Sequence, residues 1–253
     1  MSTHDCSLLV SVVAISLALL TMPAVAMETE IKIDQDKAIA GGVTPGDAPG
    51  FPITLTQPGR YVLTSNLYPP ADTDGIEIKS HDITIDFNGF RLHGFGQAQS
   101  GIRVSDVSNP SNTATIMNGV IAGFKGNAIL GSDFWTVENM RILVNGGGVV
   151  LNDWARVQRS TIAFSDIGID CRQSCLIEDN NVSSNQRIGI IKLSGTVVRN
   201  SIFNNVLHGI QGASAEFGGA VGFGHNTLAG NNQGNVQVLH VTPLNPNFCA
   251  PAC

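Results

Sequence analysis

Four hexapeptides at intervals of 20 residues decide the fold of this chain: VENMRI (137–142), VQRSTI (157–162), IEDNNV (177–182) and VVRNSI (197–202). Each hexapeptide begins and ends with a β-branched apolar residue. A third apolar column follows a glycine in every repeat, at Val149, Ile169, Ile190 and Ile210. Offsets of 0, 5 and 12 from Val137 match no helical period, whereas short Val- and Ile-rich segments broken by Gly and Asn are typical of strands. The spacing therefore predicts a solenoid of stacked coils.

The interior of such a solenoid follows from the repeat. We expect three parallel sheets around a narrow core, in which like residues of successive coils stack and each buried Val or Ile contributes about 1.5–3 kcal/mol. The column Asn145, Ser165, Asn185 and Asn205 fits a sharp corner. Asn tolerates left-handed backbone dihedrals, and its amide can bond along the stack, so a structural role is expected for this column.

The chain divides into four parts. Residues 1–26 read as a signal peptide, with an apolar run from Leu8 to Leu20 before Ala24-Val25-Ala26, although an uncleaved membrane anchor is the alternative. Residues 27–70 are expected to form an N-terminal cap, residues 71–238 the coils, and residues 239–253 a C-terminal tail. Cleavage predicts a secreted or periplasmic protein with no membrane attachment.

The N-terminal cap and the C-terminal tail each have an expected structural role. The cap should cover the unpaired strand edges of the first coil. The tail holds Pro243 and Pro246, which have no amide donor, so we expect it to leave the strand ladder. Alternation places Leu130, Val150 and Ile191 outward as an apolar stripe, which we expect the tail to cover. A contact between subunits is the alternative, and the oligomeric state stays open.

Charge and cysteine content limit the function. A formal net charge of −6 provides no footprint for nucleic acid. Four cysteines remain once the leader is removed: Cys171, Cys175, Cys249 and Cys253. An even number in an exported chain favours disulfides, and two local Cys-x-x-x-Cys loops are the simplest pairing. No metal site is expected, because no histidine or paired carboxylate accompanies either pair.

Three segments carry a family resemblance: ITIDFNGF (83–90), TVENMRI (136–142) and LIEDNNV (176–182). They resemble the short tandem repeats of right-handed parallel β-helix proteins in the pectate-lyase-like group. The resemblance implies an all-β fold, a single-stranded right-handed parallel β-helix of about 7–8 coils with an N-terminal cap. Enzymes of this group are mostly lyases, hydrolases and epimerases of acidic polysaccharides. Other members are adhesins, spikes and periplasmic accessory proteins, so the fold does not fix the activity.

The group's enzyme motifs are mostly missing. The chain has no Asp-Asp and no Arg-x-Lys, and Gly224-His225-Asn226 lacks a final glycine. A polygalacturonase-type hydrolase is therefore disfavoured, and an enzyme of this sequence would be a lyase or an epimerase. Calcium is a possible cofactor of a lyase. No catalytic residue is carried over from the group.

Candidate substrate-binding residues come from charge. Elimination from a uronate needs a cation to neutralise the carboxylate and a base near the acidic proton. The middle coils supply Asp166, Asp170, Glu178, Arg187, Lys192 and Arg199, and His208 replaces an isoleucine of neighbouring coils. Alternative structural roles are a surface ion pair for Asp166 and Arg187, a solvated ladder for Glu178, and a half-buried hydrogen-bonded His208.

The leading hypothesis is an exported β-helix protein that binds an acidic polysaccharide, with cleavage or modification left open. The alternative is a non-catalytic structural or adhesion module built from the same coils. A third reading, an accessory protein of a metal centre, needs free thiols at Cys171 and Cys175.

Overall fold

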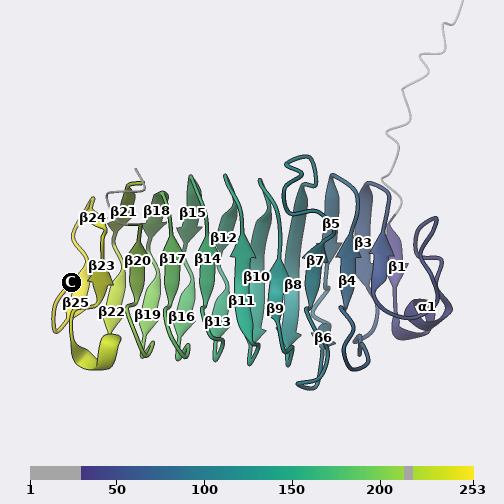
Figure 1. Ribbon diagram of the computed structural model, residues 1–253, viewed down its shortest axis with the longest axis horizontal. Helices are drawn as coiled ribbons and strands as arrows, with labels where there is room; N and C mark the ends of the chain where they lie inside the picture. Colours follow the sequence, from purple (N-terminus) through teal and green to yellow (C-terminus); the bar gives the residue numbers. More distant parts are fainter. Residues whose placement is uncertain (1–29, 214–218) are drawn as a thin grey trace, which may run out of the picture.

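The computed structural model describes residues 30–213 and 219–253, and strands account for most of its regular structure. Figure 1 shows an elongated rod in which the coils follow one another from the N-terminal to the C-terminal end. The expected signal peptide lies outside the described residues. Among the residues that are described, no helix is long and apolar enough to cross a membrane.

One side of the rod is a nine-stranded sheet in which every strand is parallel to its neighbours. We call it the nine-stranded sheet. In order, its strands are β2 (Ile53–Leu55), β4 (Ile76–Ile78), β7 (Ile102–Val104), β9 (Asn127–Leu130), β11 (Gly147–Leu151), β14 (Ile169–Cys171), β17 (Ile190–Lys192), β20 (Ile210–Gly212) and β23 (Val238–Leu239). Each strand supplies one coil, so the expected stacking of coils is confirmed.

The remaining sides belong to a sixteen-stranded sheet made of two rows. The first row contains β1 (Ile31–Ile33), β3 (Gly59–Leu63), β5 (Ile83–Asp86), β8 (Ala114–Ala122), β10 (Thr136–Leu143), β12 (Arg156–Gln158), β15 (Cys175–Glu178), β18 (Gly195–Val198), β21 (Val221–Gly224) and β24 (Thr242–Pro243). The second row contains β6 (Arg91–His93), parts of β8 and β10, β13 (Thr161–Ala163), β16 (Asn181–Ser183), β19 (Ser201–Phe203), β22 (Thr227–Ala229) and β25 (Phe248–Ala250). Because β8 and β10 continue across the corner, two of the three expected sheets are joined into one.

The strand register reproduces the sequence columns. Val137 pairs with Val157, Val157 with Ile177, and Ile177 with Val197. The columns that contain Ile142 and Val149 are paired in the same way. The members of these columns are fully buried, so the core is a stack of β-branched side chains, as in a parallel β-helix.

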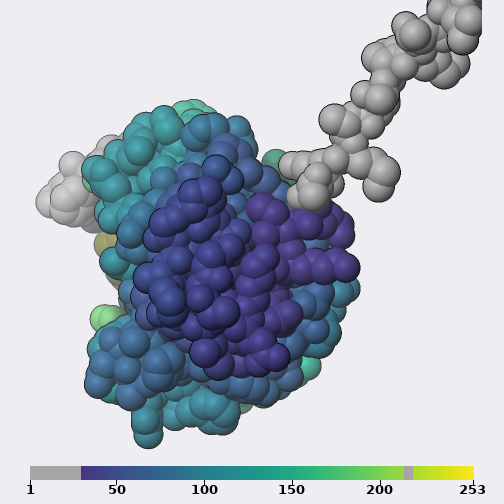
Figure 2. All heavy atoms as spheres, turned by 90° about the vertical axis from the view of Figure 1, so that its right-hand side faces the viewer, coloured from purple at the N-terminus to yellow at the C-terminus, as the bar shows by residue number. Residues whose placement is uncertain are grey.

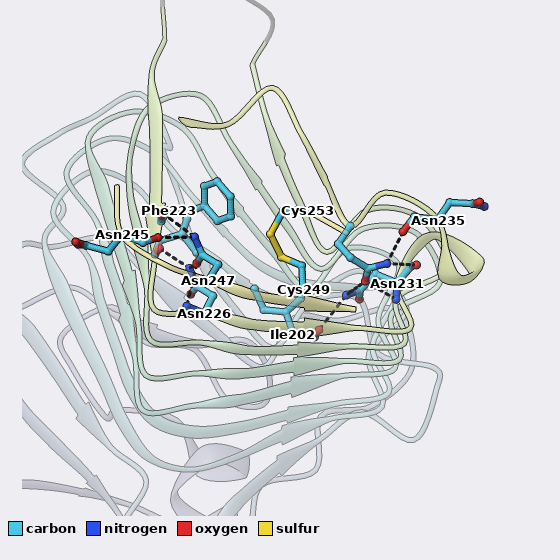
Figure 3. The surroundings of a disulfide bond; sticks show 11 residues. Ile202, Phe223, Asn226, Asn231, Asn235, Asn245, Asn247, Cys249 and Cys253 are labelled. Carbon is cyan, nitrogen blue, oxygen red and sulfur yellow. Dashed lines mark hydrogen bonds between the residues drawn. A yellow bond between two sulfur atoms is a disulfide. The ribbon is translucent and has the colours of Figure 1, made fainter. Parts of the chain in front are cut away.

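Two asparagine ladders hold the corners. At the corner before the nine-stranded sheet, the Asn205 Oδ1 atom accepts from the backbone N of Asn185 at 3.1 Å and from its Nδ2 at 2.8 Å. This confirms the structural role expected for the column. A second ladder between the two rows was not predicted; its members are Asn180, Asn200, Asn226 and Asn247. The first ladder continues to Asn231, whose Oδ1 accepts from the Asn205 N at 3.0 Å, and Figure 3 shows Asn231 on one side of the last coil and Asn226 and Asn247 of the second ladder on the other.

The N-terminal end is closed by its own short elements. Residues 51–63, which we expected within the cap, form a coil instead, because Ile53 pairs in register with Ile76 and Gly59 pairs with Ile83. The covering elements are β1 and α1 (Gln35–Ala40). Figure 2 looks onto this end, which the residues coloured purple cover.

The C-terminal tail continues the ladder, so the expectation that it leaves the ladder is wrong. β24 pairs with β21 and β25 pairs with β22, both parallel. The Leu244 N–H donates to Phe223 O at 2.9 Å, so by strand alternation the backbone N of Pro243 faces the open end, where a donor is not needed. Because the tail forms the last coil, it does not cover the stripe of Leu130, Val150 and Ile191.

Candidate functional site

A depression of about 280 Å³ lies on the outer surface of the nine-stranded sheet, at the corner before β14. The residues that line it are Gly126, Asn127, Gly146, Gly147, Gly148, Val150, Asp166, Ile167, Asp170 and Arg187. The glycines are needed for close packing of the coils, since a Cβ on Gly148 would lie 2.0 Å from Gly168 O. Three of the predicted site residues, Asp166, Asp170 and Arg187, therefore come together here.

Asp170 is the carboxyl group of the depression without a partner. In the strand register it lies between Val150 and Ile191, two apolar neighbours. Burial raises the pKa of the Asp170 carboxyl above its ordinary value. Within the described residues its side chain makes no hydrogen bond or ion pair. A partly buried carboxyl with free oxygens can bind hydroxyl groups or exchange a proton.

Asp166 and Arg187 bind each other across adjacent coils. The Arg187 Nε donates to the Asp166 Oδ1 at 2.6 Å, and a second pair joins Nη2 to Oδ2. These hydrogen bonds from Arg187 lower the pKa of the Asp166 carboxyl. The two side chains are 40% and 53% exposed, so this surface pair contributes about 0–1 kcal/mol.

Glu178 and Arg199 lie elsewhere, on the outer surface of the first row. The Arg199 Nη2 donates to the Glu178 Oε2 at 2.6 Å, and the Arg156 Nη1 donates to the Glu178 Oε1 at 3.1 Å. Two coils away, Glu138 accepts from Gln158 at 2.7 Å and pairs with Arg159. We call these residues the charge ladder: Glu138, Arg156, Gln158, Arg159, Glu178 and Arg199. The residues pair with one another in a ladder, but the side chains of Glu138 and Glu178 are only 18% and 14% exposed, so the ladder is less solvated than the structural alternative expected.

Lys192 points into the rod. It is fully buried, because the register places it in an inward column between Cys171 and Gly212. The Nζ atom donates to Thr196 O at 3.1 Å and also to Cys175 O. Burial lowers the pKa of Lys192 to about 7. This geometry offers no contact between Lys192 and a ligand on the surface, contrary to the sequence-based expectation.

His208 is half-buried at the corner before β20. Burial, followed by the charge of His240, lowers the pKa of the His208 imidazole. Its backbone carbonyl accepts from the Gly189 N at 3.1 Å. His208 does not line the depression, so it is not brought together with Asp170.

Both expected disulfides are present, one between Cys171 and Cys175 and one between Cys249 and Cys253. The first pairing removes the thiolates that a metal-centre accessory would need. Calcium, which the resemblance leaves open, prefers six to eight oxygen ligands. The depression offers it mainly the free oxygens of Asp170, and no group of three or more His, Cys, Asp or Glu within the described residues is arranged to hold a metal ion. The described residues therefore do not fit calcium.

The comparisons with known proteins concern the fold. No family model and no curated protein matches the chain. Among solved structures, it is similar to the enzymatically active domain of tailspike protein 2 of bacteriophage CBA120, with 15% identity over 78% of this chain and 40% of that one, at a TM-score of 0.47. It is also similar to the Dettilon tailspike protein, with 13% identity over 75% of this chain and 56% of that one, at a TM-score of 0.39. The chain thus spans less than two thirds of either tailspike chain, and the parallel β-helix assignment depends on its own strand register.

Proposed function

We propose that the protein binds a polysaccharide along its lateral surface, with the depression around Asp170 as the centre of the site. An elongated rod presents the same outward positions at one coil spacing after another, which suits an extended polymer. The observation that carries the proposal is the free carboxyl of Asp170 in a depression that also holds Asn127 and Arg187. Carboxylate, amide and guanidinium groups together can bond both the donor and the acceptor functions of sugar hydroxyls.

The charge balance favours a neutral polysaccharide over the acidic one expected from the sequence. In the depression Arg187 is bound to Asp166, which leaves the charge of Asp170 uncompensated. Many other cations are bound in the same way: Arg60, Lys79, Arg103, Lys125, Arg156, Arg159 and Arg199. A polyanion would meet repulsion from Asp170, whereas neutral hydroxyls would not.

A chemical step at Asp170 is the second candidate function, because burial raises the pKa of this carboxyl and no described residue occupies its oxygens. The step would be the lyase or epimerase reaction that the sequence favours over hydrolysis, and it would need a uronate, the acidic substrate that the charge of the depression disfavours. New unsaturated ends measured by absorbance, and their loss in the Asp170→Asn variant, would support this function. Binding without any product would restrict the protein to recognition.

The binding proposal is tested by affinity electrophoresis and calorimetry on the purified protein with xylan, mixed-linkage β-glucan, dextran, pectin and alginate. We expect retention by at least one neutral polymer. Asp170→Asn should weaken that binding at least tenfold, about 1.4 kcal/mol, because the amide replaces one acceptor oxygen with a donor. Asp36→Asn, at an exposed position of α1, makes the same charge change at the closed end of the rod and should leave binding unchanged. Equal binding by Asp170→Asn, or no binding to any polymer, would contradict the proposal.

A further inference from the structure

Two aromatic residues stand at a corner of the rod where the fold does not need them. Phe134 is 53% exposed and Trp154 is 62% exposed, and both have left-handed backbone dihedrals, with φ of 59° and 61°. Bulky residues rarely adopt positive φ, because the conformation is strained, and exposed aromatic surface adds no packing. In the next coil the same corner position is held by Ser174, with φ of 52°. A small polar residue therefore serves the corner, and the aromatic rings need another reason.

The two rings are arranged as a pair. Their centroids are 6.5 Å apart and their planes differ by 8°. The face of an aromatic ring carries partial negative charge, which attracts the polarised C–H groups on the flat side of a sugar ring. Two nearly parallel rings on adjacent coils, both open to solvent, suit successive units of a sugar chain.

A hollow of about 360 Å³ adjoins Phe134. Its other lining residues are Asp82, Ile83, Thr84, Thr113, Ala114 and Thr115. Thr84 pairs in register with Thr115, and Thr115 with Thr136, so one column of hydroxyl groups leads along the first row towards the aromatic pair. We call the hollow, this threonine column and the aromatic pair the threonine groove. Hydroxyl groups both donate and accept hydrogen bonds, as sugar hydroxyls do.

The insertion between β7 and β8 is held against the same corner. The Asn152 Nδ2 donates to Val107 O at 2.6 Å, and the Trp135 Nε1 donates to Asn112 O at 2.5 Å. The Ser132 Oγ donates to Asn109 O at 3.0 Å. These bonds fix a loop of mostly polar residues beside the aromatic pair, so the rings are surrounded by hydrogen-bonding groups rather than by a wide apolar patch. Polar surroundings fit a glycan better than a protein surface.

We propose that the threonine groove is a second glycan-binding site, which takes a neutral sugar chain with two of its rings against Phe134 and Trp154. The proposal rests on the proposed function in that the ligand is again a glycan, but it uses residues of the first row and none of those that line the depression.

Tryptophan fluorescence tests the groove directly. The chain has two tryptophans, and Trp135 is fully buried, so a change of emission on adding a soluble sugar reports on Trp154. The probes are cellohexaose, laminarihexaose, maltohexaose and chitohexaose. We expect at least one of them to shift the emission to shorter wavelength with saturation. By calorimetry, Trp154→Ser and Phe134→Ser should each weaken that sugar at least tenfold.

A matched control variant separates binding from folding. Phe164 is likewise exposed and has φ of 59°, but it lies at the other corner, where Ser184 takes its place in the next coil. Phe164→Ser should therefore bind the sugar as the parent does. Melting temperatures of Trp154→Ser and Phe134→Ser should not fall, because serine already occupies the same position in the next coil.

The outcomes distinguish the two sites. If Trp154→Ser and Phe134→Ser bind the sugar as tightly as the parent, or no probe changes the emission, the threonine groove is not a glycan site. If Asp170→Asn loses polymer binding while these serine variants do not, the depression stands alone. If the emission shift persists in Asp170→Asn, the groove binds independently of the depression. Binding of a protein in place of every sugar would also overturn the inference.

Discussion

The charge ladder and the depression contain similar groups and differ in how completely those groups are paired. Each has two carboxylates with arginine nearby. In the charge ladder both Glu138 and Glu178 are bonded to arginine side chains. In the depression Asp166 is paired with Arg187, whereas the strand neighbours of Asp170 are apolar. The comparison shows that charge alone does not distinguish the two regions, and that the incomplete pairing of Asp170 is what sets the proposed site apart.

The largest expected effect concerns Lys192, a second incompletely paired charged group, which is buried beneath the nine-stranded sheet. Among residues 30–213 and 219–253, Lys192 has carbonyl groups but no carboxylate as hydrogen-bond partners, and burial lowers its pKa to about 7. As pH falls from about 10 to 7, the unfolded chain binds a proton that the folded chain does not, so stability falls by up to about 5 kcal/mol and then levels off. Lys192→Met should remove this pH dependence, which urea unfolding at about pH 9.5, 8 and 6.5 measures.

The slope, rather than the absolute stability, is the result to compare. Lys192→Met also leaves the carbonyls of Cys175 and Thr196 without this donor, which costs about 1–3 kcal/mol at every pH. Lys32→Met, at an exposed position of β1, is the control and should leave the slope unchanged. A constant difference between Lys192→Met and the parent across the range would show that Lys192 titrates normally.

The next effect is the pH dependence of polysaccharide binding. The raised pKa of Asp170 means that its carboxylate is protonated at a higher pH than an ordinary aspartate, so affinity should fall as the pH drops below 7 and approach the tenfold loss of Asp170→Asn once the carboxyl is protonated. In the ladder region the hydrogen bonds from Arg199 lower the pKa of Asp179, so the charge there persists over the same range. Calorimetry at several pH values checks this, and a flat profile for the parent would exclude an ionised Asp170 as the acceptor.

A substitution in the charge ladder should change the free energy of unfolding and leave polysaccharide affinity unchanged. Glu178→Gln removes the ion pairs with Arg156 and Arg199 and should lower the free energy of unfolding by about 1 kcal/mol, less at high salt. Polysaccharide affinity should be unchanged. Denaturant unfolding and calorimetry on the same sample measure both, and a tenfold loss of affinity would move the site to the charge ladder.

The smallest expected effect comes from breaking the ion pair in the depression, which leaves its groups even less completely paired than those of the charge ladder. Asp166→Asn releases Arg187 and should cost about 0.5 kcal/mol, because the pair is exposed. The freed guanidinium should then strengthen binding to pectin or alginate relative to neutral polymers. Affinity electrophoresis measures this ratio. An unchanged ratio would mean that Arg187 does not face the ligand.

The buried columns could be predicted because the register repeats. Val137, Ile142 and Val149 recur with little change in spacing, and stacking requires like residues in the same column. The candidate residues that line the depression could be grouped as well, because strand alternation and matched corners fix the side of the rod for Asp166, Asp170 and Arg187. Strand alternation from Ile190 predicts the burial of Lys192, whereas the charge of a lysine predicts exposure, and in the structure the alternation decides.

The course of the tail and the position of the hollow could not be predicted, because both depend on three-dimensional geometry that no sequence pattern encodes. Whether Pro243 interrupts a ladder depends on which way its backbone nitrogen faces, and the sequence does not say that it faces the open end. The hollow beside Phe134 joins the ends of three coils, so no local pattern marks it. The one available signal was the aromatic residue at positions 134 and 154, where the next repeat has Ser174.

The two asparagine ladders determine where the rod can accommodate inserted residues without losing its register. Asn200 and Asn205 are separated by the same five positions as Asn226 and Asn231, although the step from Asn200 to Asn226 is 26 residues instead of 20. The extra length falls between β20 and β21, at the same corner that holds the insertion after β7. This insertion leaves both asparagine ladders intact, as does η2 (Asn232–Gly234) at the corner before the nine-stranded sheet, so the corner after β20 admits new sequence while the register is kept. Grafted peptides of varied length at that corner would give one scaffold many specificities without altering its pitch.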